Sequence, residues 1–160
     1  MSELPPWPYF PRKFPHLKLV ERYIATKWVM DERIPDSQLK WDVKLYVPLP
    51  EHVKRLLTPE ELRMTQELTA KRIDCVWEKE NEIVIVEVKD KVRHSALGQL
   101  LAYRDMYIEQ YKPRKPVRML LVCGADDPPV RKVLEKYGIE VKVVYSPESF
   151  ARLLKHLKAV

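Results

Sequence analysis

The chain has 160 residues, 46% of them hydrophobic and 32% charged, which predicts one globular domain with its own core. No apolar run approaches the ~20 residues that span a bilayer, and no secretory signal pattern opens the chain, so we expect a cytoplasmic protein with no membrane partner. The net charge of +6 favours a polyanionic partner.

The N-terminal part combines an extended segment and a helix. Residues 1–16 contain many prolines and aromatic residues, which predicts an arm docked on a surface. Residues 17–160 are predicted to form the single domain, and its first helix covers about residues 17–30. The apolar stripe of that helix consists of Leu17, Val20, Ile24 and Trp28.

A strand and a second helix follow. Residues 41–49 alternate as a strand until prolines stop it. Thr58, Pro59 and Glu61 form a capping-box pattern that starts a helix to about residue 68. Residues 48–69 are therefore predicted to be a helical insertion, which either faces a substrate or contacts a second copy of the chain.

The second half alternates strands and helices. Strands are predicted at 71–77, 82–88, 117–123 and 139–145, and helices at 95–111, 127–137 and from Ser146 onward. The first two strands are separated by a short polar turn and should form an antiparallel hairpin, whereas the last two flank a helix and should be parallel. The predicted apolar stripes are Leu97, Leu100, Leu101 and Ile108 in one helix and Phe150, Leu153, Leu154 and Leu157 in the last. This order predicts an α/β domain with a mixed sheet.

The tripeptide Glu-Val-Lys occurs twice, at residues 87–89 and 140–142. With 15 glutamates and 17 lysines, chance alone gives about 1.6 Glu-x-Lys triplets, so the tripeptide itself carries no information. Its surroundings differ, because only a short turn lies between Asp74 and Glu87. If the numbers of facing residues sum to about 161, Asp74 faces Glu87 across the hairpin. We interpret the second tripeptide as part of a solvent-exposed strand face.

Three charged side chains are predicted to meet at the first of the two tripeptides. Glu87 and Lys89 share one face of the strand and Asp74 lies opposite, while Val84, Val86 and Val88 cover the other face. Two neighbouring carboxylates favour a divalent cation, and hard oxygen ligands suit Mg²⁺ or Mn²⁺. The alternative is a purely structural buried ion cluster.

The sequence "RIDCVW", followed by "IVIVEVK", resembles the PD-(D/E)XK nuclease superfamily, whose core motif is an aspartate on one strand and Glu/Asp-x-Lys on the next. The resemblance extends to Gln99 and Tyr103, which match the Gln-x-x-x-Tyr motif of the RecB-like branch. Taken alone, these two residues also fit an ordinary polar edge on a helix. The resemblance implies a restriction-endonuclease-like three-layer fold with a mixed β-sheet flanked by helices. The proline of the family name is absent, since Arg72 and Ile73 precede Asp74.

The resemblance also implies roles for the residues. Asp74, Glu87 and the backbone carbonyl of Val88 would ligate Mg²⁺ or Mn²⁺, and Lys89 would activate or position water. Gln99 and Tyr103 would support the site or contact the DNA backbone. Glu21 is the candidate for an additional acidic ligand from the first helix, and Glu32 is the rival candidate. The alternative interpretation is that Glu21 is an ordinary solvent-exposed acid. In the RecB-like branch a histidine can fill a similar early position, which makes His16 a further candidate. Nucleic-acid contacts are expected from Lys91, Arg93 and His94.

These observations predict a metal-dependent deoxyribonuclease, either an exonuclease or a structure-selective endonuclease. One alternative is a dimeric endonuclease similar to Holliday junction resolvases, for which a homodimer is expected. Another is a catalytically silent nucleic-acid-binding or assembly subunit of the same fold. The chain has no phosphate-binding Gly-x-x-x-x-Gly-Lys loop, so a helicase partner would be a separate chain. Cys75 and Cys123 are too few for an iron–sulfur cluster and are expected to be core thiols.

Overall fold

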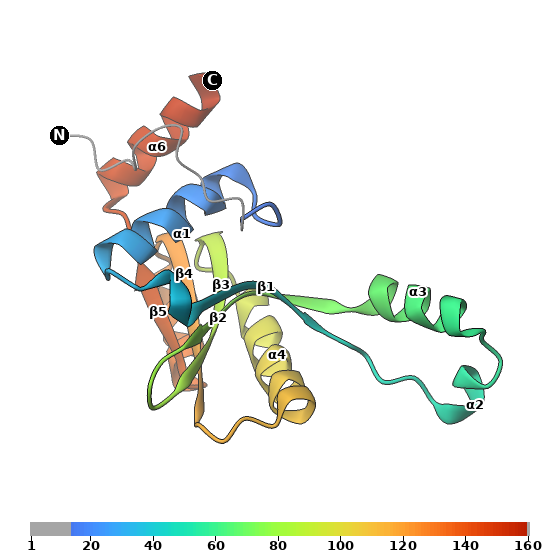
Figure 1. Ribbon diagram of the computed structural model, residues 1–160. Helices are drawn as coiled ribbons and strands as arrows, with labels where there is room; N and C mark the ends of the chain where they lie inside the picture. The colour runs from blue at the N-terminus through green and yellow to red at the C-terminus, as the bar shows by residue number, and fades with distance from the viewer. Residues whose placement is uncertain (1–13, 160) are drawn as a thin grey trace.

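The computed structural model describes residues 14–159, which form a mixed five-stranded sheet between two layers of helices (Figure 1). This confirms the predicted α/β fold, with a mixed β-sheet flanked by helices on both faces. Most of the predicted N-terminal arm, residues 1–13, lies outside the described residues. The elements are α1 Leu19–Asp31, a short 3-10 helix Asp36–Gln38, β1 Leu39–Leu45, α2 Glu51–Lys54, α3 Pro59–Thr69, β2 Lys71–Glu78, β3 Ile83–Lys91, α4 Ser95–Tyr111, β4 Val117–Ala125, α5 Pro128–Lys136, β5 Ile139–Val143 and α6 Pro147–Ala159.

The strands lie in the order β1-β2-β3-β4-β5, with antiparallel pairing among the first three and parallel pairing among the last three. Both the predicted β2–β3 hairpin and the parallel β4–β5 unit are confirmed. The hairpin has the predicted register, since Cys75 pairs with Val86 and Trp77 with Val84. Continuing this register by one residue places Asp74 opposite Glu87.

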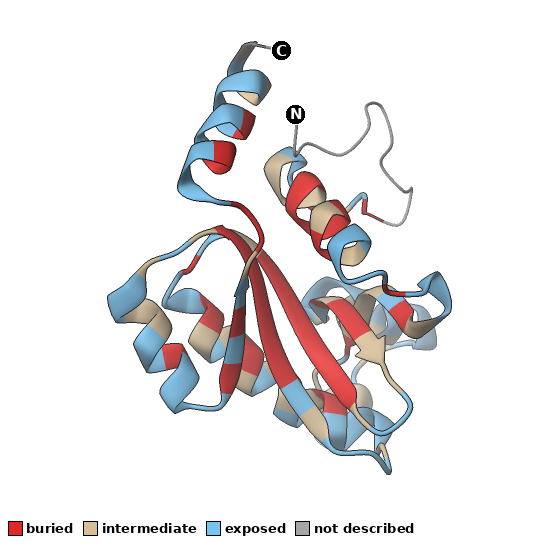
Figure 2. Cartoon of the chain, turned by 90° about the vertical axis from the view of Figure 1, so that its left-hand side faces the viewer, coloured by how far each residue is buried: buried red, intermediate tan, exposed pale blue. Residues whose placement is uncertain are grey.

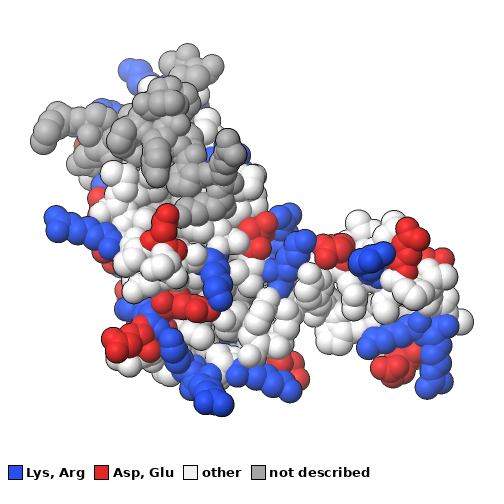
Figure 3. All heavy atoms as spheres, viewed as in Figure 1, with Lys and Arg blue, Asp and Glu red and all other residues white. Residues whose placement is uncertain are grey.

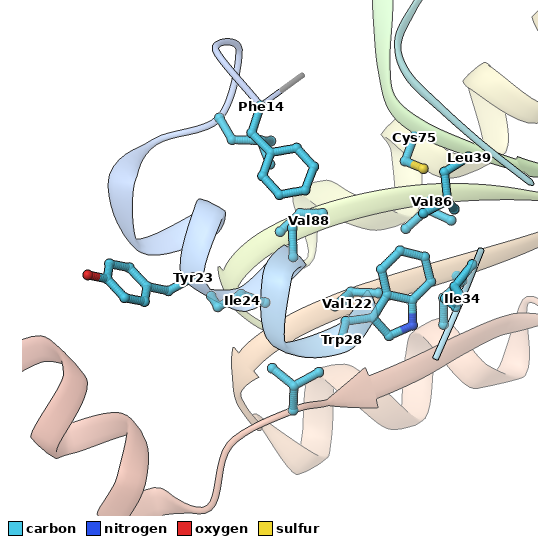
Figure 4. Packing of buried hydrophobic residues seen from close by; sticks show 14 of the residues in the cluster. Phe14, Tyr23, Ile24, Trp28, Ile34, Leu39, Cys75, Val86, Val88 and Val122 are labelled. Carbon is cyan, nitrogen blue, oxygen red and sulfur yellow. The ribbon is translucent and has the colours of Figure 1, made fainter. Parts of the chain in front are cut away.

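Each face of the sheet carries its own hydrophobic core. Helices α1 and α6 cover one face, where Trp28 and Leu153 pack against Val86 and Val122. Helices α4 and α5 cover the other face, where Leu100 and Leu134 are buried. The middle strands are therefore buried on both sides (Figure 2), and Figure 4 shows side chains of α1 lying against β3 and β4.

Two predicted apolar stripes are wrong in detail. Ile108 in α4 is 42% exposed and Leu154 in α6 is 38% exposed. The buried residues of α4 are instead Ala96, Leu100 and Tyr107. Only about one residue per helical turn can lie at the centre of the interface, so some apolar residues next to the stripe stay exposed. Aromatic packing of Tyr107 takes the place predicted for Ile108.

Strand β1 changes the face that it presents to the core. Leu39 and Trp41 pack in the α1 layer, whereas Val43 and Leu45 pack in the α4 layer. A regular strand would place all four on one side. The switch occurs at Asp42, whose φ of 59° lies in the left-handed region, where aspartate is tolerated better than most residues.

Strand β2 makes the same switch at the same level. Ile73 packs in the α4 layer and Cys75 in the α1 layer, although they are two residues apart. Asp74 lies between them, opposite Asp42 in the β1–β2 register. Arg72 holds Asp42 through a bidentate ion pair, and this guanidinium lowers the pKa of the Asp42 carboxyl. The two irregularities lie opposite each other, and they divide each strand into a part on one side of the switch and a part that leads to the helical insertion.

Beyond the switch, the chain extends away from the sheet into α2 and α3 (Figure 1). Neither helix has a buried residue, and Leu56 and Leu68 are 80% and 81% exposed. The predicted capping box is confirmed, because the Glu61 amide donates to the Thr58 hydroxyl and the Thr58 amide donates to the Glu61 carboxylate. Both helices fall within the predicted helical insertion, 48–69. None of the helices in the described part of the chain combines the length and the apolar character that a membrane crossing requires.

Candidate functional site

The Asp74 and Glu87 carboxylates meet where β2 separates from β3. The described β2–β3 pairing ends at the Cys75–Val86 pair, so that Asp74 and Glu87 are the next residues beyond it. There the Val88 amide donates to Oδ2 of Asp74 at 2.9 Å, so a side chain replaces the backbone partner that β2 no longer supplies. The Asp74 amide in turn approaches Oε1 of Glu87 at 3.4 Å. The end of the ladder therefore fixes both carboxylates.

These carboxylates are unfavourably placed for two negative charges. Glu87 is only 3% exposed. Burial, followed by the charge of Asp74, raises the pKa of Glu87 well above its usual range. Burial also raises the pKa of Asp74, although the hydrogen bond from Val88 opposes this shift. The pair therefore holds less negative charge than two exposed carboxylates would, and an added cation would be favourable there.

Lys89 lies two residues beyond Glu87 on the same face of β3, as predicted. Val84, Val86 and Val88 pack in the α1 layer, so Glu87 and Lys89 project toward α4. The ammonium is half-buried, and its charge lowers the pKa of both carboxyl groups, although less than burial raises them. The three charged side chains therefore converge, as the sequence predicted.

Glu21 approaches this group from α1. Burial has the largest effect on the pKa of Glu21 and raises it. The charge of Asp74 also raises this pKa, and the charge of Lys89 lowers it. Its Oε1 accepts a hydrogen bond from the Lys18 amide at 3.1 Å, which holds the side chain near the start of α1. The structure thus brings Glu21 close to the pair, whereas Glu32 lies exposed at the opposite end of α1.

His16 contacts Asp74 directly. Its Nε2 is 3.2 Å from the Asp74 carbonyl oxygen and 3.9 Å from Oδ1 of the same residue. Its Nδ1 is buried without a hydrogen-bond partner among the described residues. The imidazole also lies against Trp41, with ring centroids 6.5 Å apart. His16 is therefore part of the site, in agreement with its candidate position in the sequence.

Gln99 and Tyr103 bring α4 to the same place. Burial raises the pKa of the Tyr103 hydroxyl most, the charges of Glu87 and Asp74 raise it further, and the neighbouring Gln99 side chain lowers it. Oε1 of Gln99 is buried without a hydrogen-bond partner among the described residues. Such an acceptor has a desolvation cost unless a donor reaches it. It is therefore available to a water molecule or a bound substrate.

The predicted nucleic-acid-binding residues lie just outside the carboxylate group. Lys91, Arg93 and His94 are all exposed, between the end of β3 and the start of α4. Arg93 makes a bidentate ion pair with Asp90, at 2.8 and 2.9 Å, which reduces its net charge contribution. Lys91 and His94 remain exposed at the rim of the site.

The second Glu-Val-Lys tripeptide has different surroundings. Glu140 and Lys142 are exposed on the edge strand β5, as predicted. Glu140 forms a 3.0 Å ion pair with Arg118. Asp127 starts α5, and its side chain caps nothing there. Within residues 14–159, no second carboxylate therefore meets Glu140 in the way that Asp74 meets Glu87.

A divalent cation fits the chemistry of the first site. In the described part of the chain, no cluster of three or more His, Cys, Asp and Glu side chains is close enough to hold a metal ion. The donors present are instead the buried Glu87 carboxylate and the partly buried Asp74 carboxylate, with a histidine and a further glutamate beside them. Hard oxygen donors and excess negative charge suit Mg²⁺ or Mn²⁺, which complete their coordination with water or phosphate oxygens. The residues fit a cation that is only partly ligated by side chains.

The sequence did not reveal the aromatic support of His16. Phe14 is buried and packs edge-on against Trp41, with ring centroids 4.2 Å apart. Together they fix the segment that precedes α1, so that His16 reaches Asp74. The only available signal was a set of aromatic residues in a proline-rich segment, which does not specify its docking site.

Comparison with solved structures finds chains that are similar to this one. A repair endonuclease from Pyrococcus abyssi is similar to this chain with 21% sequence identity and a TM-score of 0.46, over 82% of this chain and 49% of that protein. The chain thus spans about half the length of that protein. No protein-family model matches the sequence, and no curated protein does either. Function is therefore inferred from the geometry of the site.

Proposed function

We propose that this protein is a metal-dependent deoxyribonuclease that hydrolyses phosphodiester bonds. The observation that carries the proposal is the convergence of Asp74, Glu87 and Lys89 where β2 leaves β3. A structural ion cluster would balance its charges, whereas here the buried Glu87 and the partly buried Asp74 face a single half-buried ammonium. A site with uncompensated buried charge is a candidate for cation binding and catalysis.

Asp74 and Glu87 would hold Mg²⁺ or Mn²⁺, together with the backbone carbonyl of Val88. Glu21 and His16 would act from the α1 side, either as further ligands or through bound water. Such a cation, when bound, polarises the phosphodiester and lowers the pKa of a coordinated water. The protein supplies the buried carboxylates at fixed positions, since the Val88 amide restrains Asp74.

Lys89 would orient the attacking water or stabilise the negative charge that develops on the phosphate. Its position on the same strand face as Glu87 directs it to the same reacting group. Gln99 and Tyr103 would contact the scissile region from α4, and the unsatisfied Oε1 of Gln99 can accept a hydrogen bond from that water. These assignments give each polar group near the carboxylates a role.

DNA is the proposed substrate because the exposed basic residues Lys91, Arg93 and His94 border the site. Phosphate contacts of this kind would position the backbone over the carboxylates without reading the base sequence. Affinity should therefore fall as the salt concentration rises.

The decisive experiment is cleavage of linear, circular and branched DNA with Mg²⁺, Mn²⁺ or EDTA. We expect cleavage only with a divalent cation and a loss of about 100-fold or more in Glu87→Ala and Lys89→Ala, because each removes a group that acts on the reacting phosphate. The rate is measured from product bands over time.

Glu140→Ala and Lys142→Ala are matched controls, since they make the same changes in the second tripeptide. Both should cleave like the wild type. Cleavage that persists in the Glu87 and Lys89 variants would contradict the site, and no cleavage by the wild type on any of these substrates would favour the silent binding subunit. Selective cleavage of four-way junctions by a dimer would favour the resolvase-like alternative.

A further inference from the structure

A groove of about 660 Å³ opens at the other end of α4, on the same side of the sheet as Glu87 and Lys89. Its floor consists of core residues of β1, β2 and β3, and its wall is the last turn of α4 with the segment that follows. The lining residues include Lys40, Val43, Lys44, Tyr107, Tyr111 and Arg114. The proposed catalytic site uses none of these residues.

The face switch in β1 helps to build this groove. Lys40 and Val43 are three residues apart and would lie on opposite faces of a regular strand. The left-handed conformation of Asp42 between them brings both to the α4 side. At the other wall, α4 ends at Tyr111, and the φ of 47° at the following residue, Lys112, turns the chain so that the next residues line the groove.

The groove contains an aromatic surface suited to a flat ligand. Tyr107 and Tyr111 stack with ring centroids 4.7 Å apart and an interplanar angle of 28°. Tyr107 is buried, whereas Tyr111 is 47% exposed. The Tyr111 hydroxyl donates to the Lys44 carbonyl at 3.0 Å, which fixes the ring. A fixed, half-exposed ring supported from behind is what a stacking platform requires.

The charge of the groove favours an anion. Four basic side chains line it, against one acidic side chain, Glu78. Glu78 pairs with Lys40 at 2.9 Å, and Lys44 pairs with Glu67 outside the groove. Arg114 has no hydrogen-bond or ion-pair partner within residues 14–159. In Figure 3, both Lys or Arg and Asp or Glu side chains lie on the lower part of the body, where Figure 1 shows the connection between α4 and β4.

Helix α4 connects the groove to the candidate active site. Tyr103, Tyr107 and Tyr111 follow one another at intervals of four residues and therefore lie along one side of the helix. Tyr103 is close to the carboxylates, and Tyr111 lines the groove. Eight residues of helix span about 12 Å, the length of about three or four stacked nucleotides. A single strand can therefore reach from one place to the other.

We propose that this groove binds a single-stranded nucleic-acid segment continuous with the strand at the active site, with a base stacked on Tyr111 and a phosphate on Arg114. This inference deepens the proposed function and depends on it for the assignment of the attached strand as substrate. It predicts that the preferred substrate has a single-stranded region next to the scissile bond. Base stacking together with a basic groove is the usual basis of sequence-independent single-strand binding.

The test is binding in EDTA, so that no cleavage occurs, measured by fluorescence anisotropy. The probes are a blunt duplex of about 20 base pairs and the same duplex with a tail of about eight thymidines or eight uridines. We expect the wild type to bind the tailed probes at least about 10-fold more tightly than the blunt probe. Tyr111→Ala should reduce this preference by about 5-fold or more, because a stacking contact is lost. The two tails distinguish DNA from RNA as the bound strand.

Two variants serve as controls. Tyr111→Phe keeps the aromatic ring and should keep the preference for the tailed probes. Tyr137→Ala removes an exposed tyrosine elsewhere on the surface and should behave like the wild type. Arg114→Ala tests the phosphate contact without touching the core, and we expect a smaller loss with a shallower dependence on salt. Equal tail preference in Tyr111→Ala, Arg114→Ala and the wild type would overturn the inference.

The two proposals can fail separately. If the wild type cleaves DNA but its tail preference does not depend on Tyr111 or Arg114, the groove assignment is wrong and the nuclease stands. If no substrate is cleaved but both variants lose the tail preference, single-strand binding stands and the catalytic proposal is wrong. Circular dichroism and thermal unfolding of each variant confirm that it is folded.

Discussion

Strands β3 and β5 of one sheet both carry Glu-Val-Lys, but the two glutamates have opposite surroundings. Glu87 is buried next to a second carboxylate, whereas Glu140 is exposed and paired with Arg118. In β3 the lysine is half-buried next to the carboxylates, and in β5 Lys142 is exposed. The difference shows that the surroundings of the tripeptide depend on what the fold places beside it, here Asp74 across a hairpin.

The comparison predicts, first, a large difference in cation binding. At a Mn²⁺ concentration of about 100 times the Kd, the wild type should be stabilised by about 2.7 kcal/mol, which raises the thermal midpoint of a domain of this size by about 5 to 10 °C. Differential scanning fluorimetry with and without Mn²⁺ measures the shift. Glu87→Ala should lose it, because one of the two carboxylates proposed to hold the cation is gone.

Glu140→Ala is the matched control and should keep the full shift. Equal shifts in both variants would mean that the cation binds elsewhere, and the distinction between the two tripeptides would then fail for metal binding.

The second prediction concerns stability without metal, where the two glutamates should act in opposite directions. Glu87→Gln should raise the free energy of unfolding by about 1 to 2 kcal/mol at pH 8 in EDTA, because it removes a buried charge that lies against Asp74. Glu140→Gln should lower it by less than about 1 kcal/mol, because an exposed ion pair contributes little. Urea denaturation measures both changes. A destabilised Glu87→Gln protein would show that the buried carboxylate is structural.

The smallest expected effect is the pH dependence of the ion pairs around Arg118. The hydrogen bond from Arg118, followed by the one from Lys79, lowers the pKa of Glu82 from its usual value near 4.5 to about 2. Since the folded-state pKa is the lower one, this contribution is complete above pH 4.5 and disappears as the pH falls toward 2. Because the pair is partly exposed, we expect less than about 1 kcal/mol.

Arg118→Met should therefore be slightly less stable than the wild type at pH 7, and the difference should vanish near pH 2. Denaturant titrations at several pH values in this window measure it. A difference that grows on acidification would exclude this explanation.

The fold could be predicted from the sequence where local patterns decide it. The register of the hairpin followed from its short turn, and the capping box at Thr58 placed the start of α3. The exposed Ile108 and Leu154 were predicted wrongly, because the helical period does not tell which of two neighbouring apolar residues lies at the centre of an interface. Three-dimensional packing settles that choice.

The core of the candidate site was also predictable, but its surroundings were only partly so. Asp74, Glu87 and Lys89 are close in sequence or across one hairpin, so strand geometry was sufficient. The position of His16 depends on Phe14 and Trp41, which come together from a loop and a strand. Contacts of this kind between distant segments have no local signature.

The face switch in β1 could not be read from the sequence either. Leu39, Trp41, Val43 and Leu45 form a perfect alternation, which predicts one buried face. The left-handed conformation of Asp42 divides this set between two cores, and its ion pair with Arg72 comes from a neighbouring strand. The groove beside Lys40 and Val43 depends on this switch and was therefore missed.

The divergence of β2 from β3 has a mechanical consequence. Asp74 belongs to the strand that leads out of the helical insertion, whereas Glu87 belongs to a central strand held on both sides. On the insertion side of Asp74, β2 has no described pairing with β3, so the hydrogen bonds of Asp74 with Val88 and Glu87 are the described contacts that hold the two strands together there. The hydrogen bonds that position the carboxylates therefore also hold β2 against β3 next to the helical insertion.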